Sequence, residues 1–393
     1  IPHSLGLFYG TVTQFLGYRP DSDEWKVMAM ASYGRRNNKF YDKVKRLVSF
    51  NSERDKFYID MKYFSYFTPE AQYGKFYTDE FCSEFGKPRD RDDEIKDWHN
   101  DLANAFQQVF EESMTTILSS IYEKTGMKQI CLAGGCAMNS VYNGKIREQT
   151  PFKDVFISSC PDDSGISVGA ALLAYHRNTK SAKFPIHSHN YWGPSYDNKI
   201  KEVLTKYKIN FKLLSSAEQT AAEYIADGKL IGWFQGSMEF GQRALGNRSI
   251  LADPRREETK DLVNAAVKYR ESFRPFAPAI IFERTKDYFQ IPDHAEVPYM
   301  ESVYKFRDDV VKGLGAVVHV DGTGRVQTVK KTENPKFYSL IKHFEKNTGV
   351  PIVLNTSFNL NGEPIVCTPT DAIRTFISCG LDALFIGDYL VTK

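Results

Sequence analysis

The sequence predicts an α/β protein with at least partly parallel strands, because strand-like and helix-like patterns alternate along it. Two strand–loop–helix units carry this signal. In residues 128–146 a strand runs through Gly134-Gly135 into a helix, and in 154–176 a strand runs through a Pro-Asp-Asp-Ser-Gly loop into a small-residue helix. Ligands of such sheets bind beyond the carboxyl ends of strands, where both loops fall. With 393 residues, the chain is long enough for two or three domains.

The first part of the chain is predicted to be rich in helices. Residues 4–18 have a helical pattern, and a short helix follows that ends at Gly34. Residues 40–80 are aromatic and charged without a clear period. A long helix is predicted over 92–124, because apolar side chains recur there every three or four residues. These are Leu102, Ala105, Phe106, Val109, Phe110, Met114, Ile117, Leu118 and Ile121.

Residues 181–197 are rich in Pro, Ser, His and Asn, and they are the predicted domain boundary, which gives domains 1–185 and 186–393. The elements predicted beyond it are a helix over 216–227, a strand in "KLIGWFQG", a helix with Asp253 as N-cap and Pro254 at its first position, a strand in "APAIIFE", a hairpin turning at Asp321-Gly322, a helix over 335–347, a buried strand over 350–354, and a last helix capped by Thr370 before "ALFIGDYLVT".

Composition bounds the class of protein. Lys and Arg number 51 against 49 Asp and Glu, and this near balance argues against a nucleic-acid coat or a polybasic membrane anchor. The six cysteines form no CxxC pair, and no apolar run approaches the roughly 20 residues of a membrane helix. We therefore expect a cytoplasmic protein without a membrane or nucleic-acid partner, with a homo-oligomer left open. Its first residues enter directly into an apolar pattern, so we expect the chain to start inside a domain.

Two loops of the first part are candidate ligand sites. Gly134-Gly135 lets backbone N–H groups approach a ligand, although tight packing would also explain it, and Asn139 either caps the next helix or touches the ligand. Asp162-Asp163 lies at a helix N-terminus. An N-cap carboxylate explains it, and a metal ligand is the alternative.

Cationic side chains are dense in the second part. Arg243, Arg248, Arg255, Lys268, Arg270 and Arg274 occur within about thirty residues, several of them among glycines. Arginine offers forked donors that suit phosphate oxygens, whereas a solvated surface with acidic partners is the alternative. Glycines on both sides of Arg243 and Arg248 favour a ligand-wrapping loop.

Polar side chains also mark two later segments. Arg325 and Gln327 alternate onto one face of the predicted hairpin, which is either its solvated face or a binding face. In "VLNTSFNLNGEPIV" a core strand breaks into Asn355, Ser357 and Asn359. These residues make an ordinary turn or a loop that holds an oxyanion such as phosphate.

These motifs together resemble a known family. "NTSFNLNGEPI" resembles the Thr-Ser-x-Asn-x-x-Gly loop of YrdC-like domains, and "EFGQRALGNRSILADPR", "VKYRESFRPFAP" and "HVDGTGRVQTV" resemble the C-terminal domain of O-carbamoyltransferases of the NodU/CmcH type. "EWKVMAMASYG", "LAGGCAMNS" and "CPDDSGISVGAALLAYH" resemble the first domain of that family, which has an actin/hexokinase-like (ASKHA) fold. The resemblance covers nearly the whole chain in the family's order.

The resemblance implies a partial ASKHA lobe over 1–185, followed by an α+β YrdC-like domain with a twisted mixed sheet over 186–393. The second domain would form carbamoyl-adenylate from ATP and carbamoyl phosphate, using Arg243, Arg248, Lys268, Arg270 and Arg274 for catalysis. The polar residues that would bind the nucleotide are Arg325, Gln327, Asn355, Ser357 and Asn359.

The first domain would then transfer the carbamoyl group to a hydroxyl of a small molecule or sugar. Gly134, Gly135 and Asn139 would hold the adenylate there. The resemblance implies a divalent metal at Asp163, with iron expected at the transfer site and magnesium with ATP.

One departure from the family concerns the transfer site. The family's early metal-binding histidines, spaced HxxxH, lie in an N-terminal lobe that this chain lacks, so we expect the transfer site to be incomplete here. Three other functions remain open: a hydrogenase-maturation carbamoyltransferase, which normally carries zinc-finger cysteines, a tRNA threonylcarbamoylation protein, and a non-catalytic nucleotide- or RNA-binding module.

Overall fold

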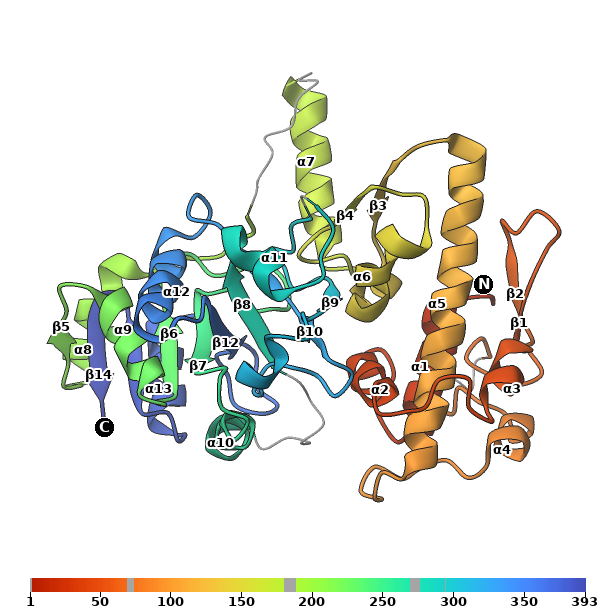
Figure 1. The fold of residues 1–393 in the computed structure, drawn as a ribbon, viewed down its shortest axis with the longest axis horizontal. Helices are drawn as coiled ribbons and strands as arrows, with labels where there is room; N and C mark the ends of the chain where they lie inside the picture. The colour runs from red at the N-terminus through yellow and green to blue at the C-terminus, as the bar shows by residue number, and fades with distance from the viewer. Residues whose placement is uncertain (1, 69–73, 180–188, 269–275, 294) are drawn as a thin grey trace. The chain divides into compact units, whose positions relative to one another are not determined.

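The computed structural model describes residues 2–68, 74–179, 189–268, 276–293 and 295–393. Its contacts divide the chain into two compact units, Ile1–Ile157 (unit 1) and Ser158–Lys393 (unit 2) (Figure 1). The predicted domain boundary after residue 185 falls within 180–188, outside the described residues, and it stays a prediction.

Unit 1 is rich in helices, and its strands are short. Its helices are α1 (Leu5–Phe15), α2 (Glu24–Ala31), α3 (Tyr41–Lys45), α4 (Asp79–Phe85), α5 (Asp97–Thr125), the 3-10 helix η2 (Gly135–Met138) and α6 (Ser140–Gln149). The strands are an antiparallel pair, β1 (Val48–Phe50) with β2 (Phe57–Ile59), and a parallel pair, β3 (Gln129–Leu132) with β4 (Asp154–Ile157). The parallel pair confirms the prediction of parallel strands.

Helix α5 is the predicted long helix, and it starts five residues later than expected. It ends where Gly126 adopts a left-handed conformation with φ of +64°, which glycine tolerates best. Its apolar stripe is buried over the first four turns, where Phe106 packs against Phe8 with ring centroids 4.7 Å apart. At the other end of the stripe, Ile121 is 41% exposed.

Unit 2 is built on an eight-stranded mixed sheet, which confirms the predicted mixed sheet. The strand order is β11-β8-β12-β7-β6-β13-β14-β5. These strands are β5 (Lys212–Leu213), β6 (Ile231–Phe234), β7 (Arg248–Ala252), β8 (Ala277–Ile281), β11 (Gln327–Val329), β12 (Ile352–Ser357), β13 (Ala383–Ile386) and β14 (Tyr389–Thr392). The pairs β11–β8 and β13–β6 are parallel, and the other pairs are antiparallel.

Helices cover both faces of this sheet. The helices of unit 2 are α7 (Gly165–Thr179), α8 (Ile200–Lys206), α9 (Ala217–Ala226), α10 (Thr259–Val263), α11 (Thr285–Tyr288), α12 (Pro335–Thr348) and α13 (Pro369–Ile377). One core joins α9 and α12 to strand residues such as Trp233 and Val353, and a second core joins α8, α10 and α13 to the alternate residues, such as Phe234 and Leu354. Because strand side chains alternate, both faces are buried and the strands have continuous apolar sequences.

The predicted start of the helix at Asp253 is wrong. Asp253 does not cap a helix: its Oδ1 accepts from the Arg255 amide at 2.9 Å, and its carboxylate also binds the Arg255 guanidinium. This local contact closes a turn, and α10 begins only at Thr259.

The predicted hairpin is also wrong. A turn does form at Asp321-Gly322, where the His319 amide donates to the Thr323 carbonyl at 2.8 Å. The segment before it forms no strand, and β10 (Thr323–Arg325) pairs instead with β9 (Val303–Lys305). Because β11 belongs to the large sheet, Arg325 and Gln327 lie on strands of two different sheets.

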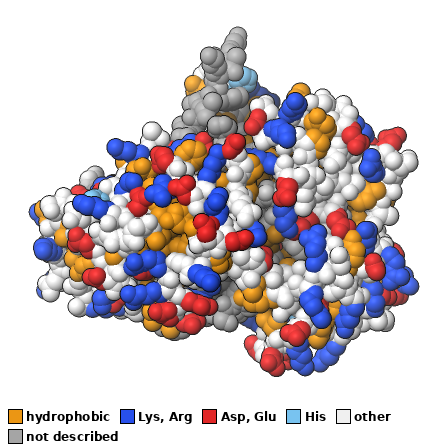
Figure 2. All heavy atoms as spheres, viewed as in Figure 1, with side chains coloured by type: hydrophobic (Ala, Val, Ile, Leu, Met, Phe, Trp, Pro, Cys, Tyr) orange, Lys and Arg blue, Asp and Glu red, His pale blue; other side chains and the backbone are white. Residues whose placement is uncertain are grey.

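Over the described ranges, no helix is long and apolar enough to cross a membrane. On the face in Figure 2, basic and acidic side chains are interspersed, in line with the near balance of charge.

Candidate functional site

The loop between β6 and β7 is organised by a buried carboxylate that the sequence analysis missed. Glu239 is 5% exposed, and its Oε1 accepts from the backbone amides of Leu245, Asn247 and Arg248 at 2.6, 2.8 and 3.3 Å. Burial raises the pKa of Glu239, against the effect of these hydrogen bonds. A Glu among glycines in "SMEFGQRALGN" is the one available signal, and it does not by itself indicate this role.

Arg243 lies in the loop that Glu239 holds, and it is half-buried. Burial lowers the pKa of its guanidinium to about 10, partly opposed by the charge of Glu301. Among the described residues Arg243 has no hydrogen-bond or ion-pair partner. A half-buried cation without such a partner is costly, and the predicted role of Arg243 in binding a phosphate stays a prediction.

Arg248 has a contrasting environment, because it is fully buried. Its guanidinium carbon lies 3.7 Å from the ring centroid of Phe234. All five N–H groups donate, at 2.6 to 3.4 Å, to backbone carbonyls of Pro194, Gln235, Gly236, Asn247 and Cys367. These contacts give Arg248 a structural role in the loop, and its predicted catalytic role stays a prediction.

Lys268 binds the polar loop that follows β12. It is 4% exposed, and its Nζ donates to the carbonyls of Ser357 (2.6 Å) and Asn359 (3.0 Å). Nζ also contacts the Ser357 hydroxyl at 3.2 Å and the Asn359 Oδ1 at 2.6 Å. The structure thus brings three of the predicted site residues together, with the ammonium at the centre of the loop.

Asn355 and Gln327 link this loop to the segment that carries Arg243. Asn355 Nδ2 donates to Gln327 Oε1 at 2.7 Å and to the Ala244 carbonyl at 3.2 Å, and Gln327 Nε2 donates to the Leu245 carbonyl at 2.9 Å. Asn355 Oδ1 is buried and has no hydrogen-bond partner among the described residues. Gln327 and Asn355 therefore join the ends of β11 and β12 to the loop of Arg243.

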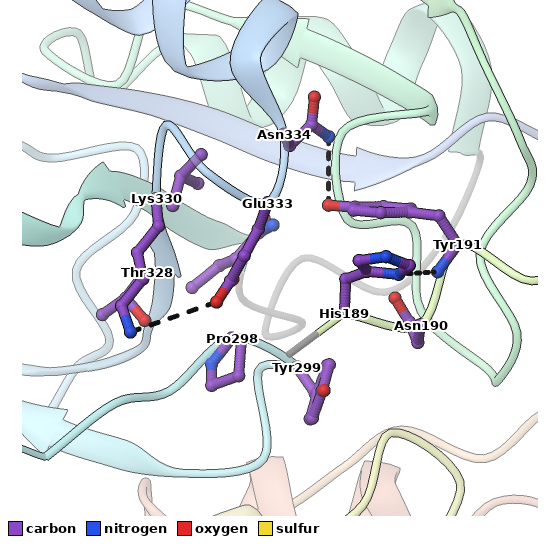
Figure 3. A pocket seen from close by; sticks show the side chains of 11 residues that line it. His189, Asn190, Tyr191, Pro298, Tyr299, Thr328, Lys330, Glu333 and Asn334 are labelled. Carbon is purple, nitrogen blue, oxygen red and sulfur yellow. Dashed lines mark hydrogen bonds and ion pairs between the residues drawn. The ribbon is translucent and has the colours of Figure 1, made fainter. Parts of the chain in front are cut away.

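A small pocket adjoins Gln327 (Figure 3). The stacked rings of His189 and Tyr191 form one wall, and the Tyr191 hydroxyl accepts from Asn334 Nδ2 at 3.0 Å. Glu333 lies 4.0 Å from Lys330 Nζ, and burial raises the pKa of the Glu333 carboxyl. No pattern in the sequence places these residues together.

The other predicted residues of unit 2 have mixed outcomes. Arg325 is half-buried on β10, whereas Arg270 and Arg274 lie outside the described residues. Asp163 is exposed, while its neighbour Asp162 binds Ser164 Oγ at 2.5 Å and the Gln242 side chain. In the described part of the chain, no three His, Cys, Asp or Glu side chains are grouped as metal ligands.

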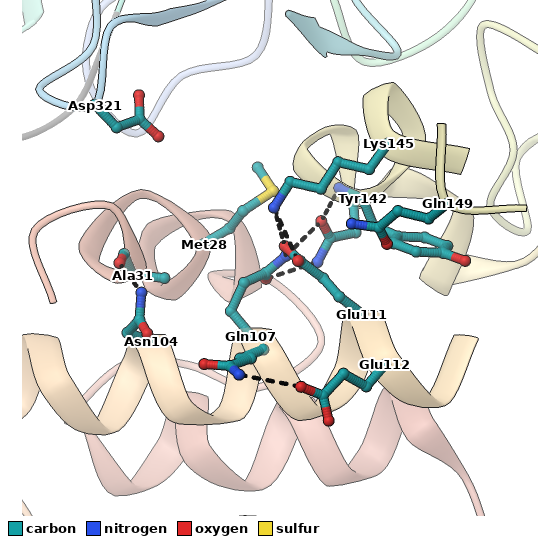
Figure 4. A network of polar contacts seen from close by, with 12 residues as sticks. Met28, Ala31, Asn104, Gln107, Glu111, Glu112, Tyr142, Lys145, Gln149 and Asp321 are labelled. Carbon is teal, nitrogen blue, oxygen red and sulfur yellow. Dashed lines mark hydrogen bonds and ion pairs between the residues drawn. The ribbon is translucent and has the colours of Figure 1, made fainter. Parts of the chain in front are cut away.

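In unit 1 Asn139 caps a helix, as one of the two interpretations predicted. Its Oδ1 accepts from the Tyr142 amide at 3.0 Å at the start of α6. The same side chain forms a reciprocal amide pair with Gln107, with distances of 2.9 and 3.1 Å. Gln107 donates in turn to Glu111, whose carboxylate binds Lys145 at 2.8 Å (Figure 4). Gln107 and Glu111, four residues apart on α5, were missed because the predicted stripe of that helix was apolar.

Gly134 and Gly135 lie at the carboxyl end of β3, as predicted, and both are exposed. Gly134 has a φ of +99°, so an L side chain would be strained there. Apart from its adjacent residues, a Cβ at either position would meet no atom of the described residues within 4 Å, so packing among the described residues does not explain the pair.

Two family models match this chain. A family model described as carbamoyltransferase N-terminus matches residues 1–172, and one described as carbamoyltransferase C-terminus matches residues 222–393. The chain belongs to the carbamoyltransferase family. Nodulation protein NolO of Bradyrhizobium diazoefficiens is 38% identical over 406 residues, which cover 100% of this chain and 69% of that protein. The predicted family is therefore confirmed, and it is a family of enzymes.

Two further relatives indicate the range of this family. Nodulation protein NolNO of Sinorhizobium fredii is 39% identical over 404 residues, covering 99% of this chain and 56% of that protein. The 3'-hydroxymethylcephem-O-carbamoyltransferase of Amycolatopsis lactamdurans is 33% identical over 257 residues, covering 65% of this chain and 47% of that enzyme. The chain thus spans 56% of the length of one nodulation relative and 69% of the length of the other.

Proposed function

We propose that this carbamoyltransferase-family chain makes carbamoyl-adenylate from ATP and carbamoyl phosphate, and that the carbamoyl group is then transferred to a hydroxyl of a small molecule or sugar. In this proposal unit 2 contains the YrdC-like domain that forms the adenylate, and the start of the chain is part of an ASKHA domain that performs the transfer. The O-carbamoyltransferase named among its relatives supports the reaction class.

The observation that carries this proposal is the environment of Arg243. Its guanidinium is half-buried and makes no hydrogen bond or ion pair with the described residues, and burial lowers its pKa only to about 10, so it stays charged at neutral pH. A polyphosphate would supply the missing negative charge. Electrostatic stabilisation of the charge that develops during adenylate formation is the largest contribution such a site makes.

The atoms balance only if water takes part in the adenylate step. ATP, carbamoyl phosphate and water give carbamoyl-AMP, pyrophosphate and inorganic phosphate. In the transfer step the acceptor oxygen forms a bond to the carbamoyl carbon, the bond from that carbon to the AMP phosphate oxygen breaks, and the hydroxyl proton is released. In the first step Arg243 would bind phosphate oxygens, and Lys268 would fix the 355–362 loop against the nucleotide.

The metal expected at the transfer site does not fit the residues described in this chain. Asp163 is an exposed carboxylate, and no other two ligand side chains of the described residues gather with it. We therefore derive no step through a metal. Iron at the transfer site and magnesium with ATP remain proposals.

The deciding experiment measures pyrophosphate release from ATP with and without carbamoyl phosphate, together with mass detection of carbamoyl-AMP. We expect release that depends on carbamoyl phosphate. In Arg243→Ala we expect release to fall by about 100-fold or more, because one preorganised charge is lost. Arg256→Ala is the matched control, since Arg256 is exposed beyond β7.

Each result separates the proposal from its alternatives. Nucleotide binding without release would favour the non-catalytic binding module. Equal release from Arg243→Ala and Arg256→Ala would overturn the role of Arg243 while leaving the reaction in place.

A further inference from the structure

A histidine outside the residues assigned so far is held at the turn before β10. The His319 amide donates to the Thr323 carbonyl at 2.8 Å, and the Gly322 amide donates to the His319 carbonyl at 3.0 Å. Lys260 Nζ donates to the carbonyl of Val318 at 3.1 Å. The backbone around this imidazole is therefore fixed on both sides of the turn.

The two hydrogen bonds of the Thr323 hydroxyl determine which ring nitrogen of His319 carries the proton. Thr323 Oγ1 lies 2.7 Å from Asp321 Oδ1 and 3.0 Å from His319 Nδ1. A carboxylate can only accept, so the single hydroxyl hydrogen of Thr323 goes to Asp321. Toward His319 the hydroxyl oxygen can then only accept, which puts the proton on Nδ1.

The other ring nitrogen is then a bare acceptor. Burial lowers the pKa of His319 to about 4, so the ring is neutral at neutral pH and Nε2 has no proton. Nε2 is buried, and among the described residues it has no hydrogen-bond partner. Leaving a buried acceptor without a donor is unfavourable, and a bound ligand with a suitable donor would remove that penalty.

The charges around the ring favour an anionic ligand as the source of this donor. Arg325 and Lys260 both act on the imidazole and favour its neutral form, whereas the charge of Asp321 acts in the opposite direction. A ligand that satisfies both features is an anion that also carries an N–H or O–H group. Carbamoyl phosphate has this chemistry through its amide, and ATP has it through its ribose hydroxyls and adenine amine.

We propose that His319 contacts the substrate in the adenylate site, with Nε2 accepting a hydrogen bond from an N–H or O–H group of a bound anionic substrate. Asp321 and Thr323 are then positioning residues, because they fix the tautomer that leaves Nε2 free to accept. This inference rests on the proposed function and adds a substrate contact to it.

The first test uses the unmodified chain labelled with 15N-histidine. Long-range 1H–15N spectra are expected to show His319 with a protonated Nδ1 and an unprotonated Nε2. Carbamoyl phosphate and α,β-methylene-ATP are added separately, and binding of each is measured by calorimetry. A shift of the Nε2 resonance with only one ligand identifies the donor as the carbamoyl amide or the nucleoside.

The outcomes separate this inference from the proposed function. If either ligand binds while the His319 Nε2 resonance stays unchanged with both, the His319 contact is wrong and the proposed function stands. If neither ligand binds, the proposed function fails, and the substrate contact fails with it. A free-state spectrum with the proton on Nε2 would also overturn the inference.

Two variants at the same position test the contact by kinetics. His319→Asn can keep the hydrogen bond toward Thr323 but has no atom at the Nε2 position, whereas His319→Gln can place an amide oxygen near it. We expect the KM of one substrate to rise about tenfold in His319→Asn with kcat changed much less, and partial recovery in His319→Gln. His343→Asn on α12 is the matched control. KM values within twofold of wild type in both His319 variants would contradict the proposal.

Discussion

Arg243 and Arg248 show how one residue type takes two roles within a single loop. Both arginines follow glycine-containing stretches, and nothing in their local sequence separates them. In the fold, Arg248 donates all five N–H groups to backbone carbonyls, while Arg243 is desolvated without a partner among the described residues. Arg248 stabilises the loop, whereas Arg243 is the residue that we propose for anion binding.

Lys268 gives a prediction at the same scale. Lys268→Met keeps the length and the apolar stem of the side chain but leaves the oxygens of Ser357 and Asn359 without their donor. We expect the free energy of unfolding of unit 2 to fall by about 2–4 kcal/mol. Faster hydrogen exchange in peptides that cover 352–362 measures this effect.

Lys346→Met is the control for this change, because Lys346 is exposed on α12. Equal exchange rates in the two variants would show that the Lys268 ammonium contributes no stability to the loop.

Among the elements, helix α13 has its N-cap two residues before the predicted position. Thr370 was the predicted cap, but Thr368 is the observed one: its Oγ1 accepts from the Asp371 amide at 3.2 Å, and the Asp371 carboxylate accepts from the Thr368 amide at 2.9 Å. Pro369 therefore occupies the first helical position, which proline favours. The capping box was visible as Thr-x-x-Asp, and the prediction overlooked it.

This difference gives a prediction with an internal control. Thr368→Ala removes the cap, and we expect it to lower the free energy of unfolding of unit 2 by about 1 kcal/mol. Thr370→Ala should have an effect close to zero, because Thr370 is exposed and lies inside the first turn. Urea unfolding monitored by circular dichroism measures both variants, and a larger loss for Thr370→Ala would contradict the assigned cap.

At the scale of the whole molecule, burial of neutral histidines makes stability depend on pH. His99 in unit 1 is 4% exposed, and burial, with help from the charges of Arg89 and Lys96, lowers its pKa to about 4. In the unfolded chain a histidine has a pKa of about 6.5. Between these two values the unfolded state binds a proton that the folded state does not, so stability falls as the pH drops from about 6.5 to about 4.

We expect this histidine alone to cost unit 1 at most about 3 kcal/mol over that window. Hydrogen exchange of peptides from α5 at pH 7 and pH 5, corrected for the intrinsic rate, measures it. His99→Asn keeps an acceptor for the Lys96 amide, which donates to His99 Nδ1 at 2.8 Å, but does not titrate. The same loss of protection at pH 5 in the variant would assign the acid sensitivity to other groups.

The class of fold, the family and most of the elements follow from local sequence. Period and turn chemistry are local properties, so α5, α9, α12 and the two strand–loop–helix units were predictable from the residues that form them. The motifs were also local, which is why Arg243, Lys268 and the 355–362 loop were identified before their positions were known.

Only the tertiary structure decided what these residues do. The prediction of the hairpin was wrong because β10 pairs with β9 and β11 pairs with β8. Such pairings depend on segments outside the predicted hairpin. Glu239, Gln107 and His319 were missed because their roles depend on burial and on hydrogen bonds that form only in the fold, within the same loop for Glu239 and His319 and with Asn139 for Gln107. A local pattern specifies the chemical groups that a loop carries, whereas desolvation and partner geometry, which decide whether a group holds the fold or meets a substrate, arise only when distant segments pack together.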